Sequence, residues 1–82
     1  ELRTQTQPLR KQIEKLEKQM EKHNAQLADA ENQLSDSAIY EQSRKADLTA
    51  ALQQQATAKS ALEACEMEWL EAQEALESIM NA

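Results

Sequence analysis

The 82-residue chain carries a formal charge of −6 and contains no glycine, one proline, one cysteine, one tryptophan and one tyrosine. Tight turns, strands and phosphate-binding loops need residues that are scarce or missing here, so the composition excludes a β fold and a nucleotide-binding loop. The dominant residues are good helix formers, and no apolar run approaches the roughly 20 residues that cross a membrane.

The first predicted element is a helix from about Pro8 to about Leu34. Residues 1–7 are polar, and proline suits the first turn of a helix, so we expect these seven residues to be a linker or a frayed helix start. Leu2 lies one heptad before Leu9, so the alternative is that the heptad pattern extends back to the start and that these residues are helical in a longer protein. The apolar residues of the helix alternate in steps of four and three, interrupted by one polar residue, His23: Leu9, Ile13, Leu16, Met20, Leu27, Ala30 and Leu34. This spacing predicts a helix that supercoils against a partner helix.

A turn is predicted over residues 35–42. Ser35, Asp36 and Ser37 compete for backbone hydrogen bonds and favour caps and turns. We expect residues 38–41 to form a short helical turn capped by Ser37, with Ile39 and Tyr40 folding over the open end of the apolar seam. Ser43 is then the expected cap of a second long helix.

The second predicted helix covers about residues 43–80 and repeats the heptad pattern. One heptad position holds Leu48, Gln55, Leu62, Trp69 and Leu76, and the other holds Ala51, Ala58, Cys65, Ala72 and Ile79. Small residues on this seam allow a close approach to the larger residues of the first helix. The sequence therefore predicts an all-α domain over residues 8–82, an antiparallel two-helix coiled-coil hairpin with a short helical turn at its tip. A swapped or four-helix dimer is the alternative, because a lone hairpin buries little surface.

Charge is unevenly distributed along the chain. Residues 1–34 contain equal numbers of basic and acidic residues, whereas residues 60–82 contain six glutamates and no basic residue. If Leu34 lies near Leu48, residues 10–22 run beside residues 60–72. Arg10, Lys11, Lys15, Lys18 and Lys22 would then face Glu63, Glu66, Glu68 and Glu71, and we expect exposed pairs of about 0–1 kcal/mol each.

Few residues suggest chemistry, and the chain is not expected to be an enzyme. His23 is the only histidine, so a polar seam residue is a better interpretation than a metal ligand. Cys65 lies among glutamates and lacks the positive surroundings that activate a thiol. Trp69 is expected to pack against the first helix near Leu9 and Ile13, and Tyr40 either caps the core or offers its hydroxyl to a partner. We assign no catalytic residue and no metal ligand.

Three segments resemble the C-terminal domain of ABC-F ATPases. Residues 8–22 (PLRKQIEKLEKQMEK) resemble its start, and residues 34–48 (LSDSAIYEQSRKADL) resemble its hairpin turn with an Asp and a Tyr. Residues 65–77 (CEMEWLEAQEALE) resemble its closing helix, in which a Trp precedes acidic and apolar residues. The resemblance covers nearly the whole chain, and its most specific parts are the Tyr-containing turn and the Trp segment.

The resemblance implies a cytoplasmic bacterial protein with two ATP-binding cassettes and no membrane domain, of which this chain is the coiled-coil tail. ATP and Mg²⁺ would bind outside these residues. Family members act on translating ribosomes, and the tails of Uup-type members are associated with DNA binding, so the expected partners are the ribosome, ribosomal RNA or DNA. The candidate contact residues are Arg10, Lys11, Lys15, Lys18, Lys22, Arg44 and Lys45. Two alternatives remain, a structural or protein-interaction module that positions the cassettes and a dimerisation coiled coil, and a monomeric hairpin is expected.

Overall fold

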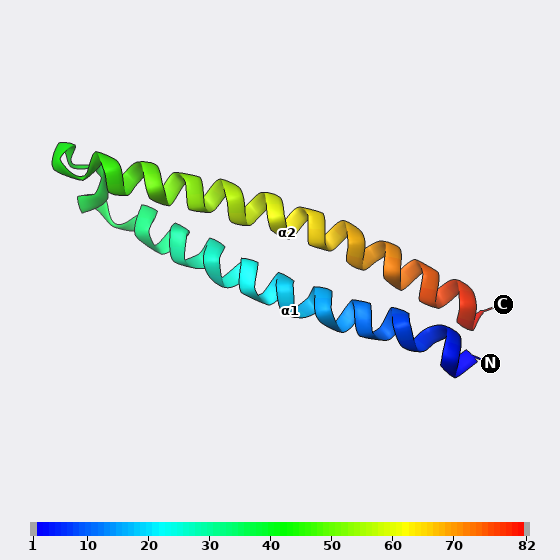
Figure 1. Ribbon diagram of the computed structural model, residues 1–82. Coiled ribbons are helices and arrows are strands. Elements are labelled where there is room, and N and C mark those ends of the chain that lie inside the picture. Colours follow the sequence, from blue (N-terminus) through cyan, green and yellow to red (C-terminus); the bar gives the residue numbers. More distant parts are fainter. Residues whose placement is uncertain (1, 82) are drawn as a thin grey trace.

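Two long antiparallel helices make up the computed structural model, which describes residues 2–81 and the side chains of residues 4–81 (Figure 1). Helix α1 covers Leu2–Ser35 and α2 covers Lys45–Met80, with the short 3₁₀ helices η1 (Ser37–Tyr40) and η2 (Gln42–Arg44) between them. The hairpin measures 62 × 15 × 14 Å, and both ends of the chain lie at the same end of it. The predicted all-α hairpin is confirmed.

Helix α1 begins at Leu2, six residues before the start expected at Pro8, as an extension of the heptad pattern back to Leu2 would give. Pro8 lies inside the helix, where it cannot donate a hydrogen bond to the carbonyl of Thr4. The helix continues through it because the seam does: Thr6, three residues before Leu9, is only 5% exposed. Residue 1 and the side chain of Leu2 lie outside the described part of the chain.

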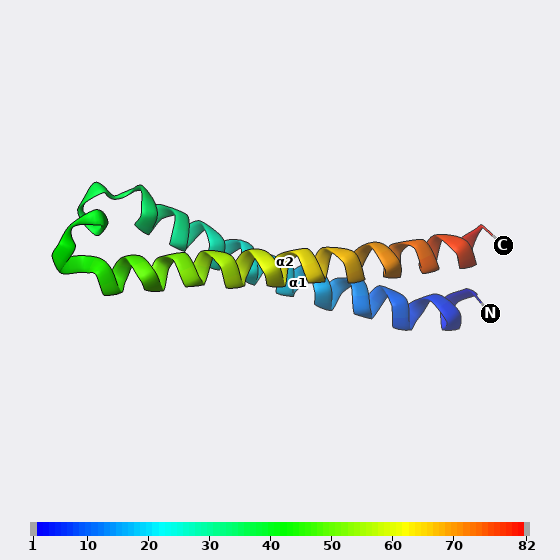
Figure 2. The same cartoon turned by 90° about the horizontal axis from the view of Figure 1, so that it is seen from above.

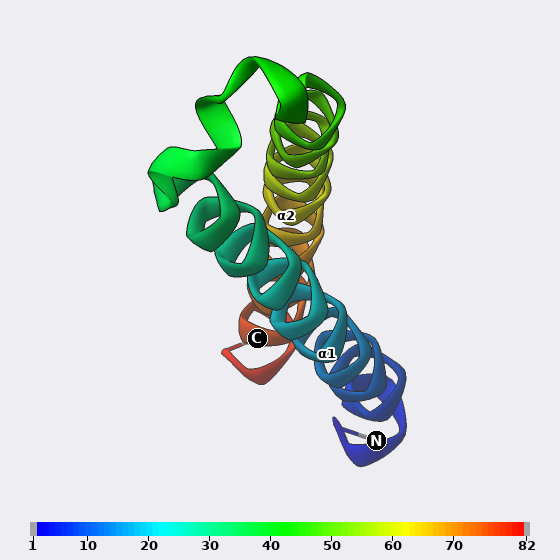
Figure 3. The same cartoon turned by 90° about the vertical axis from the view of Figure 1, so that its left-hand side faces the viewer.

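The seam between the helices combines large side chains on α1 with small ones on α2. Ile13 and Leu16 are buried on α1, together with Ala30 near the tip. On α2 the buried residues of the seam recur every seven positions, at Ala51, Ala58, Cys65 and Ala72. Small side chains at this repeat let the two backbones approach closely, and Figures 2 and 3 show the two helices crossing along their length.

The tip is closed by η1 and its cap. Asp36 Oδ1 accepts a hydrogen bond from the Ala38 amide at 3.1 Å, so Asp36 is the cap, and the prediction of Ser37 is wrong. Ile39 covers the end of the seam as predicted and is 2% exposed. Tyr40, in contrast, is 59% exposed, and its hydroxyl donates to the Leu34 carbonyl at 2.7 Å.

The second long helix begins two residues later than predicted, at Lys45. Its N-cap is Arg44, which makes no capping hydrogen bond through its side chain. The predicted cap, Ser43, instead lies within η2.

Hydrogen bonds between the helices give their alignment. Gln54 Nε2 donates to the Gln26 carbonyl at 2.9 Å and to Asp29 Oδ2 at 3.1 Å. Further from the tip, Cys65 Sγ donates to Gln19 Oε1 at 3.8 Å. These contacts fit the predicted register, in which residues 10–22 run beside residues 60–72.

Candidate functional site

Four lysines form a row along the outer face of α1. Lys11, Lys15, Lys18 and Lys22 each follow a seam residue by two positions, which is a rotation of about 200° around the helix. All four are exposed. The row, here called the basic stripe, therefore faces away from α2 and extends over about 16 Å.

The basic stripe does not pair with the glutamates of α2, contrary to the expectation from charge. Among residues 4–81 the ion pairs are local: Lys18–Glu14 at 3.9 Å and Arg44–Asp47 at 3.1 Å. The reason is geometric, because the lysines of the stripe lie on the face of α1 that is turned away from α2. Exposed pairs such as Lys18–Glu14 contribute about 0–1 kcal/mol, so Lys18 remains available to a partner.

The other predicted basic residues do not join the stripe. Arg10 is exposed, and its Nη2 lies 3.8 Å from Met80 Sδ on α2. Arg44 is half-buried at the tip, where its Nε donates to Asp47 Oδ2 at 3.1 Å. Lys45 is exposed at the start of α2. The end of α1 lies 13 residues beyond Lys22, or about 20 Å. Arg44 and Lys45 at the tip are therefore separate from the basic stripe.

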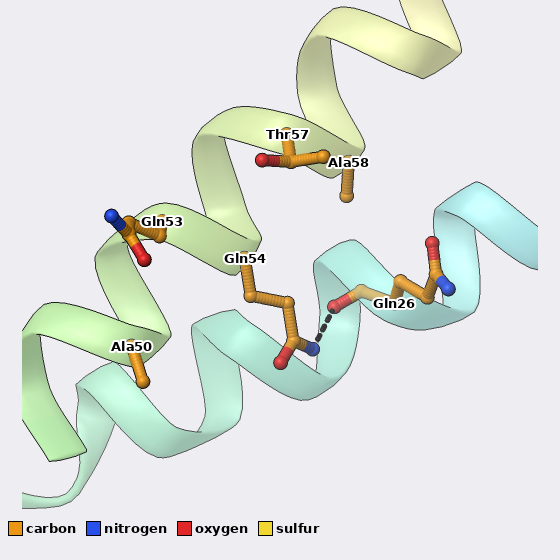
Figure 4. Close-up of a pocket in the computed structure, with 6 residues that line it drawn as sticks. All are labelled: Gln26, Ala50, Gln53, Gln54, Thr57 and Ala58. Atoms are coloured by element: carbon orange, nitrogen blue, oxygen red, sulfur yellow. Dashed lines mark hydrogen bonds between the residues drawn. The ribbon is translucent and has the colours of Figure 1, made fainter.

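A shallow groove of about 460 Å³ lies between the helices towards the tip (Figure 4). It is lined by Gln26 from α1 and by Ala50, Gln53, Gln54, Thr57 and Ala58 from α2. The hydrogen bond from Gln54 to the Gln26 carbonyl crosses it. The lining offers amides, a hydroxyl and methyl groups but no ionisable side chain, so it suits neither acid–base catalysis nor binding of a charged phosphate.

The residues considered for chemistry are all at least partly buried in the hairpin: His23, Cys65 and Trp69. His23 is half-buried, and its Nδ1 lies 3.4 Å from Gln26 Oε1. Cys65 is buried and is a free cysteine. Trp69 is half-buried, and its Nε1 is covered without a hydrogen-bond partner in the described structure. This burial supports the packing role predicted for Trp69, and its contact with Leu9 and Ile13 stays a prediction.

The donor set of the chain does not fit ATP or its metal ion. A phosphate-binding loop needs glycine for close backbone approach, and the sequence contains none. Within residues 2–81 no three His, Cys, Asp or Glu side chains gather closely enough to hold a metal ion. In the same part of the chain, no helix has the length and apolar character needed to cross a membrane.

Sequence reasoning missed several residues that the structure brings forward. Gln54 bridges the helices although it lies beside the predicted seam position Gln55. Met67 and Leu70 are 65% and 53% exposed on α2. Their position was readable from the sequence, because Met67 follows the seam residue Cys65 by two and Leu70 precedes Ala72 by two.

Residues 5–80 match the family described as the ABC transporter C-terminal domain, and the chain belongs to that family. This agrees with the resemblance to ABC-F tails.

Among its relatives, the chain is 71% identical over 80 residues to "Probable ATP-binding protein YheS" of Escherichia coli strain K12, and equally to that of Escherichia coli O157:H7. The protein of the same name from Escherichia coli O6:H1 is 70% identical. In each case the match covers 98% of this chain but only 13% of the relative. The chain thus corresponds to a small C-terminal part of an ABC-F-type ATP-binding protein. No solved structure matches it significantly.

Proposed function

We propose that this chain is the nucleic-acid-contacting tail of an ABC-F ATPase that acts on the ribosome, and that the basic stripe makes the contact. One observation carries the proposal: four lysines lie on one exposed face of α1, and within residues 4–81 none of them forms an ion pair with α2. ATP and Mg²⁺ would be bound by cassettes elsewhere in the longer protein, and the relatives carry the name of an ATP-binding protein. In this proposal the ATPase acts in the cytoplasm.

The dimensions of the basic stripe suit a nucleic-acid backbone. Phosphates on one strand of a duplex are spaced by about 3.4 Å along the axis, so a row of about 16 Å runs beside roughly five of them. Ammonium groups bind phosphates as point charges and read no sequence. The contact proposed here is therefore insensitive to base sequence and positions the tail on a duplex or on structured RNA.

The acidic total of the chain does not prevent this contact. Residues 10–22 contain five basic and three acidic residues, so the α1 edge keeps a local positive excess. The glutamates of α2 lie across a body about 15 Å wide. Charges further apart than about 10 Å are largely screened at 0.1 M salt. The glutamates of α2 therefore weaken the positive potential at the α1 edge only slightly.

Binding of the chain to a labelled DNA duplex and to ribosomal RNA fragments, measured over a range of salt, tests the proposal. If all four lysines contact phosphates, log K falls with log salt with a slope of about −3.6, which is roughly a hundredfold loss between 50 and 200 mM salt. The variant Lys15→Glu/Lys18→Glu should lose most of the binding. A matched control, Lys45→Glu/Lys59→Glu, changes net charge equally and leaves the stripe intact.

The control separates the stripe from basic residues elsewhere on the hairpin. Equal losses in the two variants would mean that total charge, not the stripe, determines binding. Absence of binding at 50 mM salt would refute the nucleic-acid contact and would favour a module that positions the ATPase cassettes.

A further inference from the structure

The outer face of α2 carries two large apolar side chains that the hairpin leaves mostly exposed. Met67 is 65% exposed and Leu70 is 53% exposed. They are three residues apart, so they are neighbours on one helix face. The two-residue offset from the buried Cys65 and Ala72 turns this face away from α1. It lies on the edge of the hairpin opposite to the basic stripe.

Glutamates surround this apolar pair in a regular way. Met67 has a glutamate one turn before it and another one turn after it, and so does Leu70. The four are Glu63, Glu66, Glu71 and Glu74, and all are exposed. None of them forms an ion pair within the described residues 4–81. We call the six residues, two apolar and four acidic, the acidic ridge.

We propose that the acidic ridge binds a lysine- or arginine-rich amphipathic helix of a partner protein. The apolar face of that helix would cover Met67 and Leu70, and its flanking cations would meet the rim glutamates. Nucleic acid is excluded as an occupant by its own negative charge. The inference does not rest on the proposed function, because it concerns the other edge of the hairpin.

A second copy of the chain fits the ridge poorly. The basic stripe of another molecule has the right charge, but its positions hold lysines and no large apolar side chain. The basic stripe could therefore pair with the rim glutamates, but it would leave Met67 and Leu70 exposed to water. Each copy also carries a charge of −6, which opposes self-association.

The length of the acidic ridge determines how long the partner helix must be. From Glu63 to Glu74 it extends over 11 residues, or about 16 Å, so the partner helix needs roughly three to four turns. A helix of that length is marginally stable alone in water. The partner segment is therefore expected to fold as it binds, in the helix-on-apolar-face mode of peptide recognition.

Fluorescence anisotropy with a labelled synthetic peptide tests the proposal. The probe is a helix-forming peptide of about 14 residues with leucines on one face and lysines on the rest. A second peptide has the same composition with the leucines and lysines shuffled, so that it has equal charge but no apolar face. We expect the first peptide to bind at least tenfold more tightly than the second.

Variants then locate the site. Met67→Gln/Leu70→Gln should weaken binding of the amphipathic peptide at least tenfold, and it should leave the fold intact because both side chains are exposed and glutamine is a good helix former. Leu52→Gln is the matched control, since Leu52 lies on the same helix and is 48% exposed but is outside the acidic segment. Its affinity should be unchanged. Glu66→Gln/Glu71→Gln should weaken binding and flatten its salt dependence.

Three outcomes would overturn the proposal. Equal binding of the two peptides would reduce the interaction to charge alone. Equal effects of Leu52→Gln and Met67→Gln/Leu70→Gln would move the site away from the ridge. If sedimentation gave twice the chain's mass of 9.3 kDa, and only Met67→Gln/Leu70→Gln restored the monomer, the occupant would be a second copy.

Discussion

Replacing Ile39 by alanine should remove a large part of the stability of the hairpin. Ile39 is the largest fully buried side chain among the described residues and is 2% exposed. The substitution deletes three carbon atoms, worth about 2.4 kcal/mol at ~0.8 kcal/mol each, and the cavity left behind brings the cost to about 2–4 kcal/mol. A chain of this length has a free energy of unfolding of about 4–12 kcal/mol, so the loss is a substantial fraction.

Urea denaturation followed by circular dichroism at the helical band measures this loss. Ile39→Val should cost only about 0.5–1.5 kcal/mol, because the side chain still fills most of the site. Leu52→Ala, on an exposed face, should change the free energy of unfolding by about 0.5 kcal/mol. A loss below about 1 kcal/mol for Ile39→Ala would show that the tip contributes little to folding, and the reasoning from burial would fail.

Two further substitutions test the tip and the seam by the same denaturation assay. Tyr40→Phe removes the hydroxyl that donates to the Leu34 carbonyl at 2.7 Å and should cost about 0.5–1.5 kcal/mol; no change would mean that water replaces this bond fully. Ala58→Leu inserts a large side chain where Ala58 is 2% exposed and should cost about 1–3 kcal/mol by forcing the helices apart; a stabilised variant would show that the seam holds spare volume there.

The heptad pattern was enough to predict the hairpin and its core. The four-three spacing from Leu9 to Leu34 and the small residues at every seventh position of α2 are repeated many times, so the helical period is well determined. Local signals were weaker. Pro8 is well suited to the first turn of a helix. The helix nevertheless includes the residues before it, because Thr6 is buried. Adjacent polar residues at the tip compete as caps, and only geometry selects Asp36 over Ser37.

The prediction of ion pairs between the helices failed because it compared the charges of two segments and did not consider which face of its helix each residue occupies. Opposite blocks lie alongside each other in the antiparallel register, yet their side chains do not meet. Each lysine of the stripe is two residues from a seam position, as are Met67 and Leu70, so the sequence contained the information that these residues face outwards. The bridge from Gln54 to Gln26 was harder to predict, because a residue at the flank of the seam can turn either towards the partner helix or towards solvent.

The narrow seam explains how one thin hairpin can offer two different surfaces. Because Ala51, Ala58 and Ala72 let the helices approach closely, the contact occupies only one face of each, and the opposite faces stay free. One carries the basic stripe and the other the acidic ridge, on opposite sides of a body about 15 Å wide. Substitutions on these edges should therefore alter binding with little effect on unfolding, and substitutions such as Ala58→Leu should do the reverse. A single variant set measured by both assays would separate the two roles, since a fold-dependent loss of binding would appear in both.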